Sequence, residues 1–205
     1  MKIFVVEANY SAHNKQDNSS FVKSEEPVFF MKPDSALLKD NKPFFIPDFS
    51  KKIVYGAQIV IRINKLGKNI GERFAHRYYD AVTVGLDLTA RDLQEKLIQQ
   101  GQPWEVAKGF DGSAVLGRFI PKEQMGDLNK LDFCLMVDGK QEQQGCSENW
   151  IFSVDRLIAW ISQFYTLKMG DLLFTGAPVG DTIATVNQHL QGYLQDQPLF
   201  DFHIR

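Results

Sequence analysis

The stretch Val54-Tyr55-Gly56-Ala57-Gln58-Ile59-Val60-Ile61-Arg62-Ile63 is the strongest structural signal in this chain. Half of its ten residues are Val or Ile. Side chains branched at Cβ are stiff in a helix but pack well on a pleated surface. The stretch therefore predicts a buried β-strand, and the rest of the chain is interpreted around it.

Many other short apolar segments, bounded by Gly, Pro or Asp, predict further strands. They are residues 3–7, 27–33, 81–88, 114–117, 119–120, 131–137, 140–145 and 172–175, with two more strands in 191–205. The pair Asp138-Gly139 is a strong hairpin signal between two of them. Residues 34–48 and 168–171 are predicted as turns, because glycine, proline and polar residues dominate them.

Two segments show the apolar spacing of a helix. The first is Thr89–Gln100, which we expect Thr89 to cap and Gly101 to end. The second is Val154–Phe164, with Asp155 in its first turn. A single helical turn is expected in Phe74–Tyr79. Many short strands with two main helices predict a β-rich α+β fold.

Length and composition limit the possible classes of protein. The chain has 205 residues, of which 44% are hydrophobic, and we expect one domain over residues 1–205. Residues 1–50 would supply an N-terminal strand and a polar lid segment, and residues 51–205 the core. The formal net charge of −2 argues against a broad electrostatic nucleic-acid binder.

The sequence also indicates a cellular location. It has no apolar run of the ~18 residues that a membrane span needs, and no signal-peptide pattern. Two cysteines, Cys134 and Cys146, are too few for a disulfide scaffold, although two thiols can still pair. We expect a cytoplasmic protein without membrane contact.

Three segments place polar residues beside strand ends and glycines. Asp87 stands where a strand runs into a helix, and it would either ligate a hard cation or cap the turn, with Arg91 paired to an acid. Lys108 lies among apolar residues and glycines. It would be either a partly desolvated cation that binds a carboxylate ligand or a surface lysine. Thr175-Gly176 offers a hydroxyl and an approachable amide for a ligand oxygen, or forms an ordinary turn.

Together these segments resemble the fumarylacetoacetate hydrolase family. Five motifs in the family's order carry the resemblance: Asn9-Tyr10-x-x-His13, Pro27-Val28-Phe29-Phe30-Met31-Lys32-Pro33, Asp87-x-x-Ala90-Arg91-Asp92-Leu93-Gln94, Lys108-x-Phe110-Asp111 and Gly170-Asp171-Leu172-Leu173-Phe174-Thr175-Gly176-x-Pro178. The family's fold is a mixed β-roll, usually in a homodimer. Its members cleave, decarboxylate or isomerise small oxo or diketo acids.

The resemblance implies a role for each matching residue. A Mg²⁺ or Mn²⁺ ion would polarise the substrate's oxygens, with Asp87 as one ligand. Lys108, Gln94, Thr175 and Gly176 would hold the substrate, and His13 would activate water together with the residue three positions on.

The chain departs from the family pattern at three acidic positions. Gly56 and Gln58 stand where two metal-binding glutamates belong, so Gln58 is a weak ligand at best. Gln16 replaces the glutamate that partners His13, and an amide is no general base. Two readings stay open: an enzyme whose Lys108 supplies the cation, and a non-catalytic relative that binds an oxo acid or serves as a partner subunit.

Overall fold

The computed structural model describes residues 1–11, 25–178 and 180–205, and within them the strands form two sheets. The larger has nine strands, and its path is β2 (Val28–Lys32), β1 (Ile3–Glu7), β10 (Leu172–Phe174), β4 (Ile53–Ile63), β5 (Tyr79–Ala90), β6 (Ala114–Leu116) and β3 (Leu37–Leu38), with β11 (Thr182–Ile183) beside β4 and β7 (Ile120–Pro121) beside β5. The smaller runs β13 (Gln197–His203), β12 (His189–Leu194), β8 (Asp132–Val137) and β9 (Lys140–Cys146). The predicted β-rich α+β fold is confirmed.

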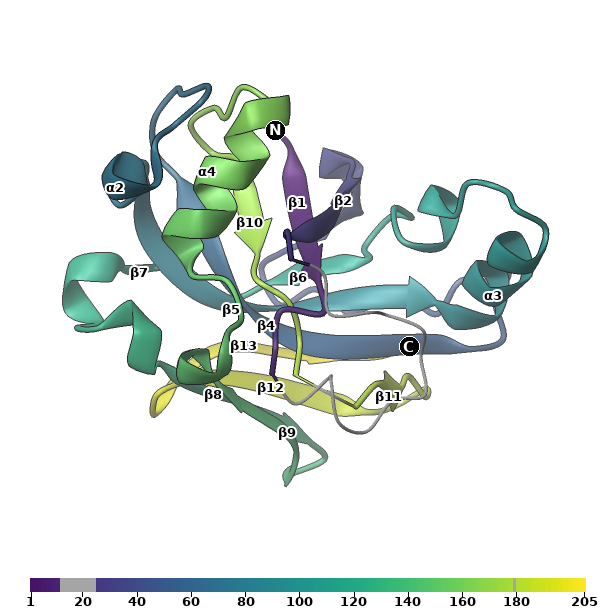
Figure 1. The fold of residues 1–205 in the computed structure, drawn as a ribbon. Helices are drawn as coiled ribbons and strands as arrows, with labels where there is room; N and C mark the ends of the chain where they lie inside the picture. The colour runs from purple at the N-terminus through teal and green to yellow at the C-terminus, as the bar shows by residue number, and fades with distance from the viewer. Residues whose placement is uncertain (12–24, 179) are drawn as a thin grey trace.

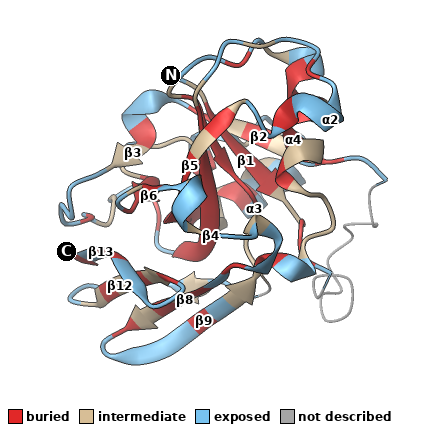
Figure 2. Cartoon of the chain, turned by 90° about the vertical axis from the view of Figure 1, so that its left-hand side faces the viewer, coloured by how far each residue is buried: buried red, intermediate tan, exposed pale blue. Residues whose placement is uncertain are grey.

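The predicted strand at residues 54–63 is β4, and it lies in the middle of the larger sheet (Figure 1). It pairs with β5 over its whole length in an antiparallel ladder, in which Gly56 stands opposite Asp87. Both strands are almost completely buried (Figure 2). A strand covered on both faces needs apolar side chains on both, which explains the high Val and Ile content of β4.

The two faces of the larger sheet carry separate hydrophobic clusters. One face packs Phe4, Ile59 and Ile61 against helix α4 (Val154–Phe164) and the smaller sheet, which lies below β4 and β5 in Figure 1. The other face gathers Val5, Phe30 and further apolar residues in a smaller cluster. This division follows from strand geometry, because alternate side chains point to opposite faces.

The larger sheet is curled. Lys32 of β2 lies 2.6 Å from Asp87 of β5, although β1, β10 and β4 separate these strands in the sheet. Gly85 is needed inside the curl, since a Cβ there would lie 2.5 Å from the Val115 carbonyl oxygen and 2.9 Å from the Phe174 ring. The larger sheet therefore curls around the smaller cluster.

Three α-helices occur in the described residues. The predicted helix Val154–Phe164 is confirmed as α4, and Ser153 caps it by accepting a hydrogen bond from the Arg156 amide. Helix α3 (Arg91–Gln99) is confirmed, but the expected Thr89 cap is wrong: Thr89 belongs to β5, and no side chain caps α3. Helix α2 (Glu72–Ala75) begins two residues before the expected turn at Phe74–Tyr79.

Single turns of 3₁₀ helix connect many of the strands. They are η1 (Asp34–Ala36), η2 (Glu105–Ala107), η3 (Lys122–Gln124), η4 (Leu128–Lys130) and η5 (Ser147–Asn149). The predicted hairpin turn between β8 and β9 is confirmed, with φ of 50° at Asp138 and 76° at Gly139.

Both cysteines are free thiols. No helix within the described residues is long and apolar enough to cross a membrane.

We predict that Gly85→Ala destabilises the protein by about 1–3 kcal/mol, because its methyl group would overpack the curl of β5. Gly71→Ala is the matched control, since a Cβ there meets only Phe74 at an ordinary 3.6 Å. Urea denaturation followed by circular dichroism measures both variants. Equal stability of the two variants would contradict this account of the curl.

Candidate functional site

Four charged side chains meet inside the curl of the larger sheet, and we call Glu7, Lys32, Asp87 and Lys108 the charged cluster. Lys108 Nζ lies 3.0 Å from Asp87 Oδ2 and 3.2 Å from Glu7 Oε1. Lys32 Nζ lies 2.6 Å from Asp87 Oδ1. The cluster thus joins β1, β2, β5 and the segment after η2, and it confirms that Lys108 is desolvated rather than on the surface.

The Lys32 ammonium group is fully buried and contacts three oxygen atoms. Its Nζ donates hydrogen bonds to the carbonyl oxygens of Leu88 and Ser113, at 3.0 and 2.7 Å, and its side chain has no exposed surface. Its Nζ also forms an ion pair of 2.6 Å with Asp87 Oδ1. With three oxygens around Nζ, Lys32 fixes where the Asp87 carboxylate lies.

Lys108 has a different environment. It follows η2, and Ser113 Oγ donates a hydrogen bond of 2.8 Å to its carbonyl oxygen, which fixes the backbone there. Its ammonium lies 4.8 Å from the centre of the Phe30 ring. Within the charged cluster, its ammonium group pairs with the carboxylates of Glu7 and Asp87, which together compensate its charge.

The pKa values follow from burial and from these neighbours. Burial lowers the pKa of Lys32 to about 8, although Asp87 opposes the change. Burial would raise the Asp87 pKa, but the two ammonium groups outweigh it and hold that pKa below its ordinary value. Burial would lower the Lys108 pKa, but Asp87 and Glu7 raise it overall. At neutral pH both Asp87 and Lys108 are therefore charged.

Glu7 is the exposed member of the cluster. Its side chain is 30% exposed, against 8% or less for the other three. It stands at the end of β1, and Ala8 follows with φ of 51°, so the chain turns out of the sheet directly after Glu7. This carboxylate can meet both solvent and a ligand at Lys108.

Two neutral side-chain amides, Gln58 of β4 and Gln143 of β9, lie at the middle of β4, where Gly56 stands opposite Asp87. Gln58 Oε1 accepts a hydrogen bond of 2.8 Å from the Gly176 amide. Gln143, which reaches over from β9, accepts one of 2.6 Å from the Ala57 amide. A Cβ at Gly56 would lie 3.0 Å from Ala177 Cβ and 4.0 Å from Gln143 Nε2, so the turn after β10 closes over the glycine.

The donor set beside Asp87 does not suit a divalent cation. Gly56 has no side-chain ligand, and Gln58 Oε1 is already engaged. Asp87 is bracketed by two ammonium groups, which repel a metal ion. Mg²⁺ and Mn²⁺ prefer anionic oxygen ligands. No group of three or more His, Cys, Asp or Glu side chains in the described parts of the chain has metal-binding geometry.

The predicted Thr175-Gly176 turn lies close to this site, but its donors are in use. The Thr175 hydroxyl donates a 2.9 Å hydrogen bond to the Ile59 carbonyl oxygen. Gly176 has φ of 98°, a conformation that favours glycine. Buried Asn9 donates to the Thr175 carbonyl oxygen at 2.9 Å and so ties this turn to the chain just after β1.

Gln94 and Arg91 form a separate group at the start of α3. Arg91 donates a hydrogen bond of 2.9 Å to Gln94 Oε1, and it also pairs with Asp181. The expectation that Arg91 pairs with an acid is confirmed, whereas Asp87 binds lysines instead of capping a turn. His13 and Gln16 lie outside the described residues.

Sequence reasoning did not select Glu7, Lys32 or Gln143. Glu7 and Lys32 are single charged residues at strand ends, where a charged side chain is usually solvated. The sequence marks Lys32 only by its place in the motif Pro27–Pro33, which gives the direction of its side chain no signal. Gln143 lies in a polar strand that gives no sign of a buried amide.

Comparisons with known proteins agree with this fold. A family model described as fumarylacetoacetate (FAA) hydrolase C-terminal matches residues 2–205. The chain belongs to the fumarylacetoacetate hydrolase family. An oxaloacetate tautomerase of Escherichia coli is 38% identical over 180 residues, which are 87% of this chain and 81% of that protein.

Two solved structures of the family are also similar to it. One is a fumarylacetoacetate hydrolase family protein of Yersinia pestis, with a TM-score of 0.92 at 35% identity over 100% of this chain and 93% of that one. The other is a fumarylpyruvate hydrolase of Pseudomonas aeruginosa in complex with Mn²⁺ and pyruvate. Its TM-score is 0.89 at 28% identity, over 100% of this chain and 89% of that one.

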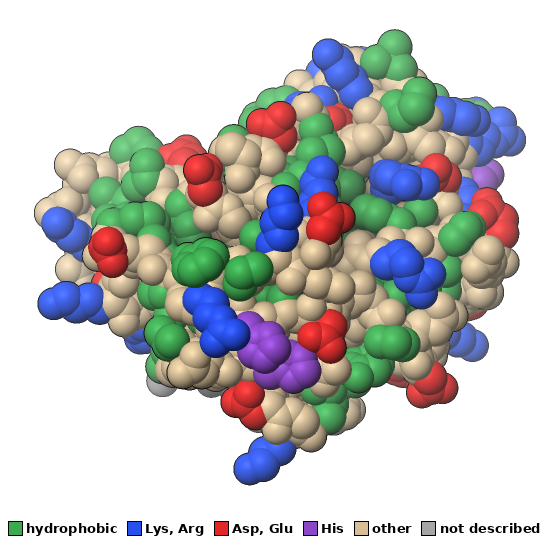
Figure 3. All heavy atoms as spheres, turned by 180° about the vertical axis from the view of Figure 1, so that it is seen from behind, with side chains coloured by type: hydrophobic (Ala, Val, Ile, Leu, Met, Phe, Trp, Pro, Cys, Tyr) green, Lys and Arg blue, Asp and Glu red, His purple; other side chains and the backbone are tan. Residues whose placement is uncertain are grey.

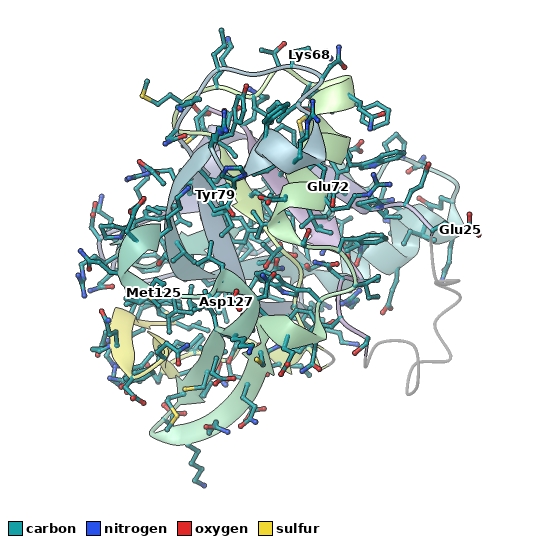
Figure 4. All side chains as sticks on the ribbon, turned by 60° about the vertical axis from the view of Figure 1, so that its left-hand side comes forward. Glu25, Lys68, Glu72, Tyr79, Met125 and Asp127 are labelled. Carbon is teal, nitrogen blue, oxygen red and sulfur yellow. The ribbon has the colours of Figure 1, made fainter. Side chains whose placement is uncertain are left out.

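A cavity of about 510 Å³ lies elsewhere, beside α2 and the N-terminus of α4. Glu72 and Tyr79, which line it, are labelled in Figure 4. Tyr79 begins β5, eight residues before Asp87, or about 26 Å along an extended strand. This cavity is therefore not part of the charged cluster.

On the smaller sheet, His189 and His203 stack with ring centroids 4.5 Å apart, and His189 Nε2 lies 2.7 Å from Asp201 Oδ1. Figure 3 shows acidic and basic side chains intermixed on the face that carries the histidine pair. His189 and His203 belong to strands of the smaller sheet, not to the curl that holds the cluster.

We predict that Lys32→Met destabilises the protein by about 3–5 kcal/mol, because it leaves a buried carboxylate with one cation fewer and two carbonyl oxygens without a donor. Lys68→Met, at the exposed lysine labelled in Figure 4, should cost no more than about 0.5 kcal/mol. Chemical denaturation at pH 7 measures both. A loss below about 1 kcal/mol for Lys32→Met would contradict the structural role given to Lys32.

Proposed function

We propose that this protein isomerises a small 2-oxo acid between its keto and enol forms without a divalent metal ion. The observation that carries the proposal is the placement of Asp87 between the ammonium groups of Lys32 and Lys108, beside a strand that offers no free anionic ligand. These two protein cations already pair with the one carboxylate that the family resemblance assigns to the metal ion.

Lys108 would act as the electrophile. Removing a proton from the carbon next to a carbonyl group places negative charge on the carbonyl oxygen, and a fixed ammonium stabilises that charge. Asp87 and Glu7 keep Lys108 protonated, because they raise its pKa. Lys32 would neutralise Asp87, which leaves the Lys108 charge for the ligand.

Isomerisation suits the residues better than hydrolysis does. Hydrolysis needs a base that activates water, and Gln16 stands where the family pattern has a glutamate. Isomerisation transfers one proton within the substrate and consumes no water. The similarity to the E. coli oxaloacetate tautomerase supports this choice, and it points to a 2-oxo dicarboxylic acid as substrate.

A second candidate is an oxo-acid-binding protein without turnover. The specific observation in its favour is that Gln58 and Ile59 already accept the hydrogen bonds of Gly176 and Thr175. A ligand would have to displace these bonds before the turn could hold its carboxylate. The homodimer and the cytoplasmic location stay predictions.

We predict that Mg²⁺ and Mn²⁺ at millimolar concentration show no saturable binding to the protein in calorimetry. The result should be the same with and without oxalate, which mimics an enolate. The physical reason is the loss of two carboxylates and the presence of two ammonium groups. The matched gain-of-function variant is Gly56→Glu with Gln58→Glu, which should bind Mn²⁺ at least about tenfold more tightly. Tight Mn²⁺ binding by the natural sequence would refute the metal-free proposal.

We also predict that the protein interconverts oxaloacetate tautomers in excess EDTA, as followed by the ultraviolet absorbance of the enol. Lys108→Met should lower the rate by about 10²–10³-fold, because it removes a charged donor to the developing oxyanion. Lys68→Met is the control and should keep the natural rate. Oxalate binding without any turnover would select the second candidate.

A further inference from the structure

We propose that Glu7 is the catalytic base that removes the proton from C3 of the 2-oxo acid. This assignment rests on the function proposed above and names the group that this function still lacks, since Lys108 supplies only the electrophile. No sequence motif marks Glu7, and only the structure brings it to the charged cluster.

The position of Glu7 follows from the alternation of β1. Glu7 shares a face with Ile3 and Val5, and this is the face that the curled sheet encloses. In the ladder with β2, Val5 stands opposite Phe30, the residue whose ring lies under the Lys108 ammonium. Glu7 is one alternation further along and reaches Lys108 Nζ at 3.2 Å.

Exposure separates Glu7 from Asp87, the other carboxylate at Lys108. Asp87 is 8% exposed, bound by two ammonium groups, and its pKa is held below the ordinary value, so it is both hidden and weakly basic. Glu7 is 30% exposed and has one ion pair in the cluster, with Lys108. A base must reach the substrate, and of the two carboxylates only Glu7 meets this condition.

The proton transfers balance without any added reactant. The Glu7 carboxylate takes the C3 proton, the C–H electron pair forms the C2=C3 bond, and the carbonyl π electrons move to the oxygen. Lys108 donates a proton to that oxygen, which gives the enol. The proton on Glu7 then passes to the neutral Lys108 amine across their 3.2 Å contact. The net change is one proton moved from C3 to oxygen.

The test compares Glu7→Gln, Glu7→Asp and the remote surface variant Glu123→Gln, with oxaloacetate in EDTA. Glutamine keeps the shape of glutamate but accepts no proton, so we expect the rate to fall by about 10²–10⁴-fold. Oxalate binding, measured by calorimetry, should change by less than about threefold. Glu7→Asp should retain more activity than Glu7→Gln, and Glu123→Gln should match the natural protein.

Deuterium incorporation supplies a second readout. In D₂O a base fixed on one side of the bound substrate exchanges one C3 hydrogen faster than the other, and Glu7→Gln should abolish this preference.

A Glu7→Gln rate within threefold of the natural rate would overturn the assignment of Glu7 and leave the proposed function intact. Loss of oxalate binding together with rate would overturn it too, since Glu7 would then hold the site together. A natural protein without turnover would overturn the proposed isomerase itself, and the base assignment with it.

Discussion

The ion pair between Lys32 and Asp87 is the interaction on which the rest of this structure depends. It joins two strands of the same sheet that three other strands separate, so it exists only when the sheet is curled. An unpaired charge inside that curl would cost several kcal/mol, which makes each partner a condition for burying the other. Gly85 allows the same curl sterically, because any larger residue would meet the Val115 carbonyl oxygen.

The same pair determines the character of the candidate site. Lys32 neutralises Asp87, Asp87 and Glu7 keep Lys108 charged, and the amides of Gln58 and Gln143 take up the backbone hydrogen bonds of the neighbouring strand and turn. The result is a site in which two ammonium groups pair with two carboxylates beside neutral amides. Both carboxylates of such a site are already paired with ammonium groups, whereas a hard cation prefers anionic oxygens that are free to bind it.

Glu7 shows how a chain can place a carboxylate without a local motif. It comes two residues before the buried Asn9, which ties the start of the next segment to the Thr175 carbonyl oxygen. The turn at Ala8 ends the strand, and strand alternation turns Glu7 toward Lys108. Position in the sheet, rather than neighbours in the sequence, gives this residue its chemistry.

The sequence by itself determined the strand at 54–63, helix α4, the hairpin at Asp138-Gly139 and the family, because local side-chain preferences and ordered motifs encode these features. It also selected Asp87, Lys108 and Thr175. It misplaced Thr89 as a helix cap, since the pairing of β5 with β4 extends the strand past the point where local propensity ends it. Only the tertiary structure selected Lys32, Glu7 and Gln143. The hydrogen-bond and ion-pair partners of their side chains lie 35 or more residues away in the chain, so the contacts that give them a role arise only when the chain folds.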